Sequence, residues 1–338
     1  MDTPTLFDEE IRQEKINGLK NPLFELDSII DWNIFRKPIS DALVKSVKGP
    51  GGRPAFDYVI MFKILVLQKL YNISDEQTEF QILDRQSFRT FLKIVNKVPD
   101  STTIWLFREN LTNAGVIDKL FALFNKQLES KNLITKTGCI VDASFVEVPR
   151  QRNTRDENKE IKNGKIPENW DNPKKISQKD TDARWTMKRN IAHYGYKNHI
   201  KIDKDSKIIT HFSITAANVH DSVEIDKLID ENDKELYADA GYIGTENRLP
   251  ENVLKHICVK GYRYKKLTDN DKEQNRIKSK IRCRVEHVFG TMKTAMNNAL
   301  KIRSIGIKRA VFLVGLANLV YNILRLKTII KYRQTVSF

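Results

Sequence analysis

Two aspartates stand where a carboxylate is costly to bury. Asp142 interrupts the β-branched apolar run CIVDASFV, and Asp239 follows the run ELYA and precedes Ala-Gly-Tyr. A carboxylate in or just after a buried strand needs a hydrogen bond, a counter-charge or a metal ion. Polar groups at strand ends commonly line a site in open α/β sheets. Taken singly, each aspartate is more readily explained as a capping or turn residue, so other groups must decide.

A third acid lies on a predicted helix, in the segment IKSKIRCRVEHVFGTMK. Glu286 and Lys293 follow Arg282 by four and eleven residues. At about 100° per residue, the three side chains fall within roughly 40° of one another on one helix face. A surface ion pair between residues four apart would explain Arg282 and Glu286. It would not explain why they follow two strand carboxylates in this order.

Three acids on two strands and a helix suit metal-assisted phosphoryl transfer. Carboxylate oxygens are the ligands that Mg²⁺ prefers. Two ions about 3.5 to 4 Å apart would activate the attacking oxygen and stabilise the leaving one. We therefore predict that Asp142, Asp239 and Glu286 are catalytic and hold two Mg²⁺ ions, for which Mn²⁺ could substitute. Arg282 and Lys293 would grip phosphate oxygens beside them.

The charge of the chain favours an anionic partner. Its 338 residues include 58 Lys+Arg and 43 Asp+Glu, for a formal charge of +15. Residues 260–309 hold 15 basic and 4 acidic residues, so the helix bearing Glu286 lies in the most basic part of the chain. Such a surface suits a DNA backbone. An anionic membrane surface or simple solubility is the alternative explanation of the charge.

The elements that must position these residues fall into two parts. Apolar segments such as 58–72 predict helices, and we expect an all-α N-terminal domain over residues 1–130. From Gly138 on, β-branched runs predict strands alternating with helices, and we expect a mixed α/β domain over residues 135–338. The predicted strands are 138–149, 199–204, 207–215, 235–242 and 256–261, and the predicted helices are 219–230, 271–296 and 306–329.

A long basic loop is predicted at about residues 150–197. Residues 150–201 show little hydrophobic periodicity and hold 14 basic against 7 acidic residues. Within them Trp185, Tyr194 and Tyr196 interleave with basic residues, including Lys188 and Lys197. This pattern suits stacking on unpaired bases with the phosphates held nearby. Local packing of the rings is an equal alternative.

Other acidic groups could compete for the metal. Asp180 and Asp182 lie in the basic loop, where we expect them to be solvated. The pair His220 and Asp221 could act as a ligand or base. We favour Asp221 as the cap of the helix that follows, because Asn-Val-His-Asp-Ser has the composition of a helix N-terminus.

Composition excludes several classes of protein. The cysteines are far apart and have no histidine partner at zinc-ligand spacing, which argues against a disulfide framework or a structural zinc. The N-terminus lacks the profile of a secretory signal. The longest apolar run, 310–324, is interrupted by Asn318, Tyr321 and Asn322, so we expect a buried helix rather than a membrane span. We expect a reduced, cytoplasmic protein.

The motifs in their order resemble those of DDE transposases of bacterial insertion sequences, most closely the insertion-sequence-five group. The string CIVDASFVEVPRQRN is followed by DARWTMK, HYGYKNHIKID, ANVHDS, YADAGY and RCRVEHVFGTMK. The segments GRPAFDYVIMFKILVLQKLYNISDEQ and VPDSTTIWLFRENL are similar to the N-terminal helical domain of that group. This similarity implies that the helical domain over residues 1–130 serves DNA binding or dimerisation. The resemblance runs from about residue 23 to residue 326.

The resemblance implies a ribonuclease H-like fold for the second domain and places the family's catalytic triad on Asp142, Asp239 and Glu286. Its Tyr-Arg-Glu-Lys signature is matched at Arg282, Glu286 and Lys293. Ser279 stands where the family has its Tyr. A shorter hydroxyl would therefore have to make the phosphate contact credited to that Tyr.

The resemblance also implies a function. It implies a Mg²⁺-dependent transposase that cleaves DNA at the inverted-repeat ends of an element and transfers the 3′-hydroxyl to target DNA. Such an enzyme would act as a homo-oligomer on DNA in the bacterial cytoplasm, associated with the nucleoid, with no membrane partner. A ribonuclease H-like nuclease that cuts without joining, and a DNA-binding protein with a spent active site, are the alternatives.

Overall fold

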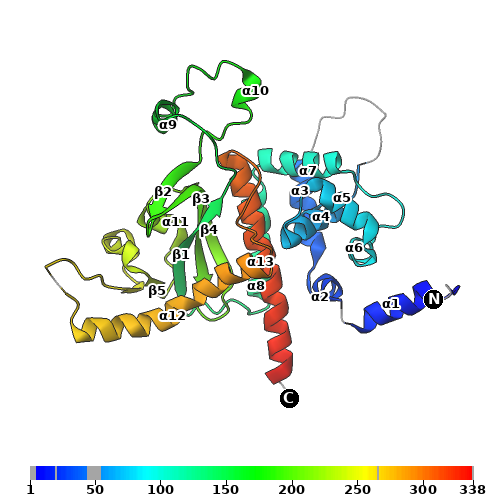
Figure 1. Cartoon of the computed structure of the whole chain (residues 1–338). Helices are drawn as coiled ribbons and strands as arrows, with labels where there is room; N and C mark the ends of the chain where they lie inside the picture. The colour runs from blue at the N-terminus through cyan, green and yellow to red at the C-terminus, as the bar shows by residue number, and fades with distance from the viewer. Residues whose placement is uncertain (1–4, 20, 44–54, 265, 337–338) are drawn as a thin grey trace.

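The computed structural model describes residues 5–19, 21–43, 55–264 and 266–336. A helical N-terminal region precedes a mixed sheet that carries two long helices (Figure 1). The N-terminal helices are α1 (Asp8–Gly18), α2 (Pro22–Ile29), α3 (Arg36–Ala42), α4 (Tyr58–Tyr71), α5 (Asp75–Asp84), α6 (Gln86–Leu92), α7 (Ser101–Asn113) and α8 (Ile117–Ser130). Helix α4 is buried on nearly every side, as its continuous apolar sequence predicts.

The sheet has six strands: β1 (Cys139–Glu147), β2 (Arg184–Lys188), β3 (Ile191–Asp203), β4 (Ile209–Ala216), β5 (Glu235–Ala238) and β6 (Leu254–Ile257). Leaving β2 aside, the spatial order is β4, β3, β1, β5, β6. Strand β3 pairs antiparallel with β1 and β4, whereas β1, β5 and β6 are parallel. This is the ribonuclease H-like order, so the predicted fold class is confirmed.

Close pairing of β1 with β3 depends on one glycine. Gly195 lies opposite Glu147 and has a φ of 141°, which L side chains rarely adopt. A Cβ atom there would lie 2.2 Å from the carbonyl oxygen of Val146. Any larger residue would push the two strands apart near the end of β1.

The two faces of the sheet bury different residues. Ile140 belongs to the large core shared with the long helices, whereas Cys139 and Val141 belong to a smaller core that includes residues of β5 and of α11 (Ile225–Leu228). Because side chains alternate along a strand, Asp142 faces the same side as Ile140. Helix α12 (Asp269–Thr294) crosses that side and contacts β1 and β5 (Figure 1).

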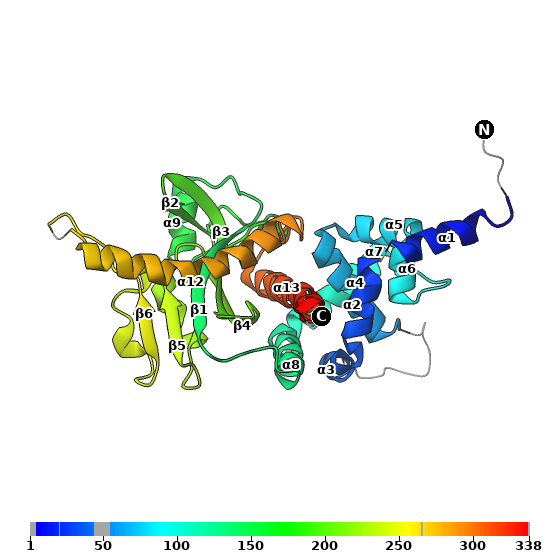
Figure 2. The ribbon, with the colours of Figure 1, turned by 90° about the horizontal axis from the view of Figure 1, so that it is seen from below.

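Helix α13 (Ile307–Val336) lies between the sheet and the N-terminal helices (Figure 2). By length and composition it could cross a membrane, yet 67% of its most apolar window is buried inside the protein. Two buried amides fix it there: Asn318 pairs with Asn198 of β3, and Asn322 pairs with Asn125 of α8. Residues 310–324 therefore form a core helix, as the interrupted apolar run predicts.

The predicted loop at about 150–197 is wrong over part of its length. It contains α9 (Arg155–Lys162), α10 (Pro173–Ile176), β2 and the first half of β3. Strand β2 is mostly exposed, so it lacks the apolar alternation that marks a strand. Arg189 and Asn190, both with positive φ, form the turn between β2 and β3.

One hydrophobic core joins the two predicted domains. The buried cluster includes Phe62 of α4, Phe124 of α8, Ile200 of β3 and Leu319 of α13. The predicted boundary near residues 130–135 coincides with the end of α8 and precedes β1. The interior is nevertheless continuous across that boundary, because α13 packs against both parts.

Candidate active site

Asp142 and Asp239 lie side by side on neighbouring parallel strands. Ile140 of β1 is in register with Tyr237 of β5. Asp142 and Asp239 each follow by two residues, so they lie at the same level of the sheet on the same face. The negative charge of Asp239 disfavours ionisation of Asp142 and so raises its pKa, as expected of two nearby carboxylates.

One carboxylate oxygen of each aspartate accepts a hydrogen bond from a backbone amide one or two residues further along the chain. Asp142 Oδ1 accepts from the amide of Ala143 at 2.8 Å, and Asp239 Oδ1 accepts from the amide of Gly241 at 2.8 Å. A Cβ atom on Gly241 would lie 2.9 Å from Asp239 Oδ1, so a glycine there leaves room for the carboxylate. Within the part of the chain that the structure describes, Asp239 Oδ2 has no hydrogen-bond partner.

Burial dominates the electrostatics of this pair. The pKa of Asp142 is raised to about 6. Burial is the largest cause of this rise, and the charge of Asp239 contributes to it. The Ala143 amide and the Arg282 guanidinium oppose the rise. The pKa of the neighbouring Tyr242 is also raised, by burial first and then by Asp221, Asp142 and Asp239. An added positive charge would therefore be strongly stabilised here.

Arg282 connects α12 to the sheet. Its Nη1 lies 3.4 Å from Asp142 Oδ2, and its Nη2 lies 3.6 Å from Glu286 Oε1. Its Nε is buried and has no hydrogen-bond partner among the described residues. The Glu286 side chain is 62% exposed. The shared helix face of Arg282 and Glu286 thus meets Asp142, as the sequence predicts.

The carboxylates are close but do not form one coordination sphere. Among residues 5–19, 21–43, 55–264 and 266–336, no three acidic, His or Cys side chains are close enough together to hold a metal ion. The guanidinium of Arg282 lies between Asp142 and Glu286 instead. Two adjacent hard carboxylates, one with a free oxygen, still match the ligands that divalent cations such as Mg²⁺ require.

The other residues predicted on α12 are exposed. Ser279 lies one turn before Arg282, and Lys293 lies in the last turn of the helix. Both side chains are open to solvent and lie on the helix that carries Glu286. They are therefore accessible to a long polyanion that reaches the aspartates.

The residues predicted in the basic loop divide into two groups. Trp185 is 43% exposed and tilts against Tyr194 with ring centroids 5.0 Å apart, and the guanidinium of Arg150 lies 5.7 Å from its ring. Lys188 is also exposed, but its ammonium lies over the ring of Phe145. Lys197 is engaged within the protein, because its ammonium donates to Asp221 at 2.8 Å and to the carbonyl of Val219 at 2.7 Å.

The expected cap at Asp221 is wrong. His220 caps the short helix by accepting from the amide of Ser222, which leaves Asp221 free to pair with Lys197. Asp221 also lies 4.0 Å from the buried His199, whose pKa burial lowers to about 4, so that imidazole is neutral. Sequence reasoning missed His199 and Tyr242, although both lie in quoted motifs, HYGYKNHIKID and YADAGY.

The expectation that Asp180 and Asp182 are solvated is also wrong. Asp180 is 1% exposed and accepts from the hydroxyl of Tyr196 and from the amides of Asp182, Ala183 and Gly306. Asp182 accepts from the amide of Ile307 at 3.0 Å. These carboxylates hold the start of α13 and do not face the site.

Comparison with known proteins identifies relatives of both parts of the chain. Residues 134–323, more than half of the chain, match the family described as "Transposase DDE domain". Residues 10–110 match the family described as "Transposase domain (DUF772)". A solved structure described as a cryo-EM structure of piggyBac transposase synaptic complex with hairpin DNA is similar over 88% of this chain and 74% of its own. It has 12% sequence identity to this chain and a TM-score of 0.45.

Proposed function

The chain belongs to the transposase DDE domain family, and on this premise we propose that Asp142, Asp239 and Glu286 are its catalytic metal ligands. It is a DDE transposase, a phosphoryl-transfer enzyme that uses divalent metal ions. We propose further that two Mg²⁺ ions serve the reaction and that the chain belongs to the insertion-sequence-five group. The motif order from CIVDASFVEVP to RCRVEHVFGTMK supports that group.

One observation carries the assignment of the triad. Arg282 contacts both Asp142 and Glu286. The face of α12 that carries Arg282 and Glu286 is therefore held near β1, the strand that bears Asp142. The parallel register places Asp239 beside Asp142. These contacts support the proposal that three acids, 97 and 47 residues apart in sequence, act together at the two inner strands β1 and β5.

The residues of the chain supply distinct parts of the reaction. Asp142, Asp239 and Glu286 would hold the divalent cations, which would supply activation of an attacking oxygen and stabilisation of the leaving one. Asp142 and Asp239 hold carboxylate oxygens in place through backbone hydrogen bonds, and Glu286 approaches from the helix. Arg282 can turn from the carboxylates to a phosphate oxygen, for which its two-pronged guanidinium is suited. Lys293 and Ser279 would hold the same strand along α12.

The proposed substrate is DNA. The sequence of reactions is cleavage at the inverted-repeat ends of an element, followed by attack of the freed 3′-hydroxyl on a target phosphodiester. Two ends must be held at once, which favours a homo-oligomer on DNA. Support comes from the charge of +15 and from the exposed ring of Trp185, which offers a stacking surface beside the guanidinium of Arg150. Lys188 is a further exposed cation on the same strand.

The test is a joining assay. Purified protein is incubated with Mg²⁺, a supercoiled target plasmid and a duplex whose element end already has a free 3′-hydroxyl. We expect joined products that are lost when the 3′-hydroxyl is replaced by hydrogen. Nicking of the plasmid without any joined product would instead indicate a nuclease that cuts only.

Replacement of Arg282 tests its role in binding phosphate. We expect Arg282→Ala to slow joining by about 100-fold and Arg282→Lys by less, because Lys keeps the charge but not the fork. Affinity for Mn²⁺, measured by isothermal titration calorimetry, should not weaken, since the variant removes a cation from between Asp142 and Glu286.

The control is Arg276→Ala, which removes an exposed ion pair with Glu273 on the same helix. That variant should join at the normal rate. If Arg282→Ala joined normally and mainly lowered the melting temperature, Arg282 would be a structural ion pair.

A further inference from the structure

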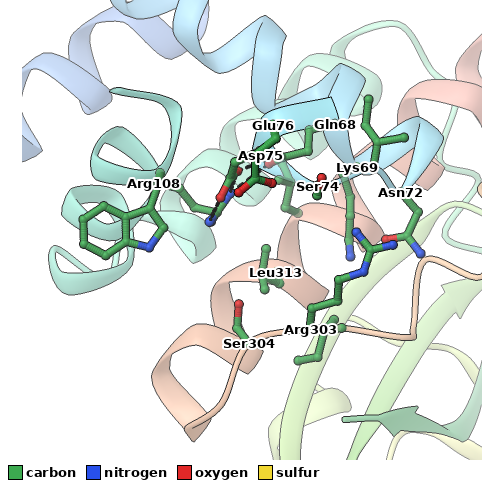
Figure 3. Close-up of a pocket in the computed structure, with 14 residues that line it drawn as sticks. Gln68, Lys69, Asn72, Ser74, Asp75, Glu76, Arg108, Arg303, Ser304 and Leu313 are labelled. Carbon is green, nitrogen blue, oxygen red and sulfur yellow. Dashed lines mark hydrogen bonds and ion pairs between the residues drawn. The ribbon is translucent and has the colours of Figure 1, made fainter. Parts of the chain in front are cut away.

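A pocket lies away from the aspartates, between the N-terminal helices and the segment before α13. Its volume is about 270 Å³. It is lined by the end of α4, the start of α5, part of α7 and residues 302–304 (Figure 3). Lys69, Arg108 and Arg303 all line it, so three cations from three different segments surround one cavity.

Lys69 is a buried cation without a carboxylate partner. Lys69 is only 5% exposed, and its ammonium donates to the carbonyl of Ala299 at 2.8 Å. Burial, and then the nearby charges of Arg108 and Arg303, lower the pKa of Lys69 to about 7. Burying an ammonium is costly unless an opposite charge accompanies it. No described carboxylate supplies that charge, so an anion bound in the pocket would stabilise the ammonium form of Lys69.

The other charged groups leave the pocket positive. Arg108 is neutralised by Asp75, whose Oδ2 accepts from its Nη2 at 2.8 Å. Arg303 points toward Lys69 (Figure 3) and makes no hydrogen bond or ion pair with the described residues. Glu76 is exposed at the rim and is the remaining acid. The buried Lys69 and the exposed Arg303 therefore lie close together at the pocket (Figure 3), and neither pairs with a carboxylate of the described residues.

The pocket is fixed relative to the catalytic helix. Asn72 donates to the carbonyls of Asn297 and Asn298, and Asn297 donates back to the carbonyl of Tyr71. These bonds join the end of α4 to the segment that follows α12 directly. A group bound between Lys69 and Arg303 would thus be held at a set distance from Glu286.

We propose that this pocket is a second phosphate-binding site, which takes a backbone phosphate of the DNA whose scissile bond lies at the aspartates. The proposal rests on the function proposed above. A phosphodiester carries one negative charge and acceptor oxygens for both cations, and it reaches the pocket from an open side. The net charge of the chain favours a polyanion over a small carboxylate. Contacts of this kind position DNA and carry no sequence information.

Salt dependence of DNA binding tests the proposal. Binding of a duplex bearing the element end is measured by fluorescence anisotropy over a series of NaCl concentrations. Arg303→Ala should weaken binding by about tenfold and reduce the slope of log K against log [NaCl] by about 1, the signature of one lost phosphate contact. Lys69→Met should reduce the slope similarly without lowering the melting temperature, because it removes an unmatched buried charge.

The control is Lys308→Ala, which removes an exposed cation at the start of α13 that does not line the pocket. Its slope should equal that of the wild type. Equal slopes for Arg303→Ala, Lys69→Met and wild type would overturn the proposal. Joining by the wild-type protein is measured in parallel. A failure of the phosphate-site proposal can then be distinguished from a failure of the proposed function.

Inorganic phosphate distinguishes the source of the anion. Melting temperatures are compared in phosphate and in chloride at equal ionic strength. Stabilisation of the wild type that is absent in Arg303→Ala, together with the altered DNA slope, supports the proposal. Stabilisation through Arg303 with an unaltered DNA slope would mean that the pocket takes a free anion, and would overturn its assignment to DNA.

Discussion

Cleavage at element ends should fall at least about a thousandfold in each of the variants Asp142→Asn, Asp239→Asn and Glu286→Gln, because loss of one ligand removes several kcal/mol of stabilisation from the transition state. Each change keeps the size of the side chain and removes its charge. Binding of the end duplex should stay within about twofold, since these carboxylates hold metal and do not contact bases. Cleavage is measured on a labelled duplex with Mg²⁺, and binding is measured by anisotropy in Ca²⁺.

Glu273→Gln is the matched control. Glu273 lies on α12, as Glu286 does, but its carboxylate pairs with Arg276 on the surface. This variant should cleave at the wild-type rate. Normal cleavage by any one of the three active-site variants would remove that residue from the triad.

Asp180→Ala should lower the free energy of unfolding by about 3 to 5 kcal/mol, the range seen when a buried charged partner is removed. The carboxylate is nearly inaccessible and accepts from Tyr196 and from three backbone amides. Without it, these donors are left buried and unsatisfied. Urea unfolding followed by circular dichroism measures the change.

Asp182→Ala provides the comparison. Asp182 is only partly buried, and its side chain accepts from the amide of Ile307 at the start of α13. Loss of such a cap costs about 1 kcal/mol. If the two variants lost equal stability, the buried network around Asp180 would not be the cause.

The sequence was sufficient where a local pattern has one physical explanation. The β-branched run CIVDASFV predicted a strand with Asp142 inside it, and that strand is β1. The spacing of Arg282 and Glu286 placed both on one face of α12, where their contact is found. The order of strands followed from the resemblance and is confirmed by the pairing of β1 with β3 and β5.

What could not be predicted depends on contacts between distant segments. Asp180 is buried because Tyr196 and Gly306 converge on it, and neither lies near it in sequence. The sequence predicted Lys197 as a DNA contact, but its ammonium pairs with Asp221, which is distant in sequence. Strand β2 has a polar sequence and exists because β3 is there to pair with it. The position of Arg282 between two carboxylates likewise requires α12 to cross β1.

The central place of α13 has a consequence for synthesis. The helix completes the interior of both the N-terminal helices and the sheet, yet it leaves the ribosome after both of them. Contacts between residues so far apart in the chain form slowly, because a long loop must close first. Neither part can finish its core during translation before residues 307–326 emerge. A shortened product that ends before α13 would thus expose apolar surface on both parts, and would be prone to aggregation and degradation rather than able to bind DNA with half a site.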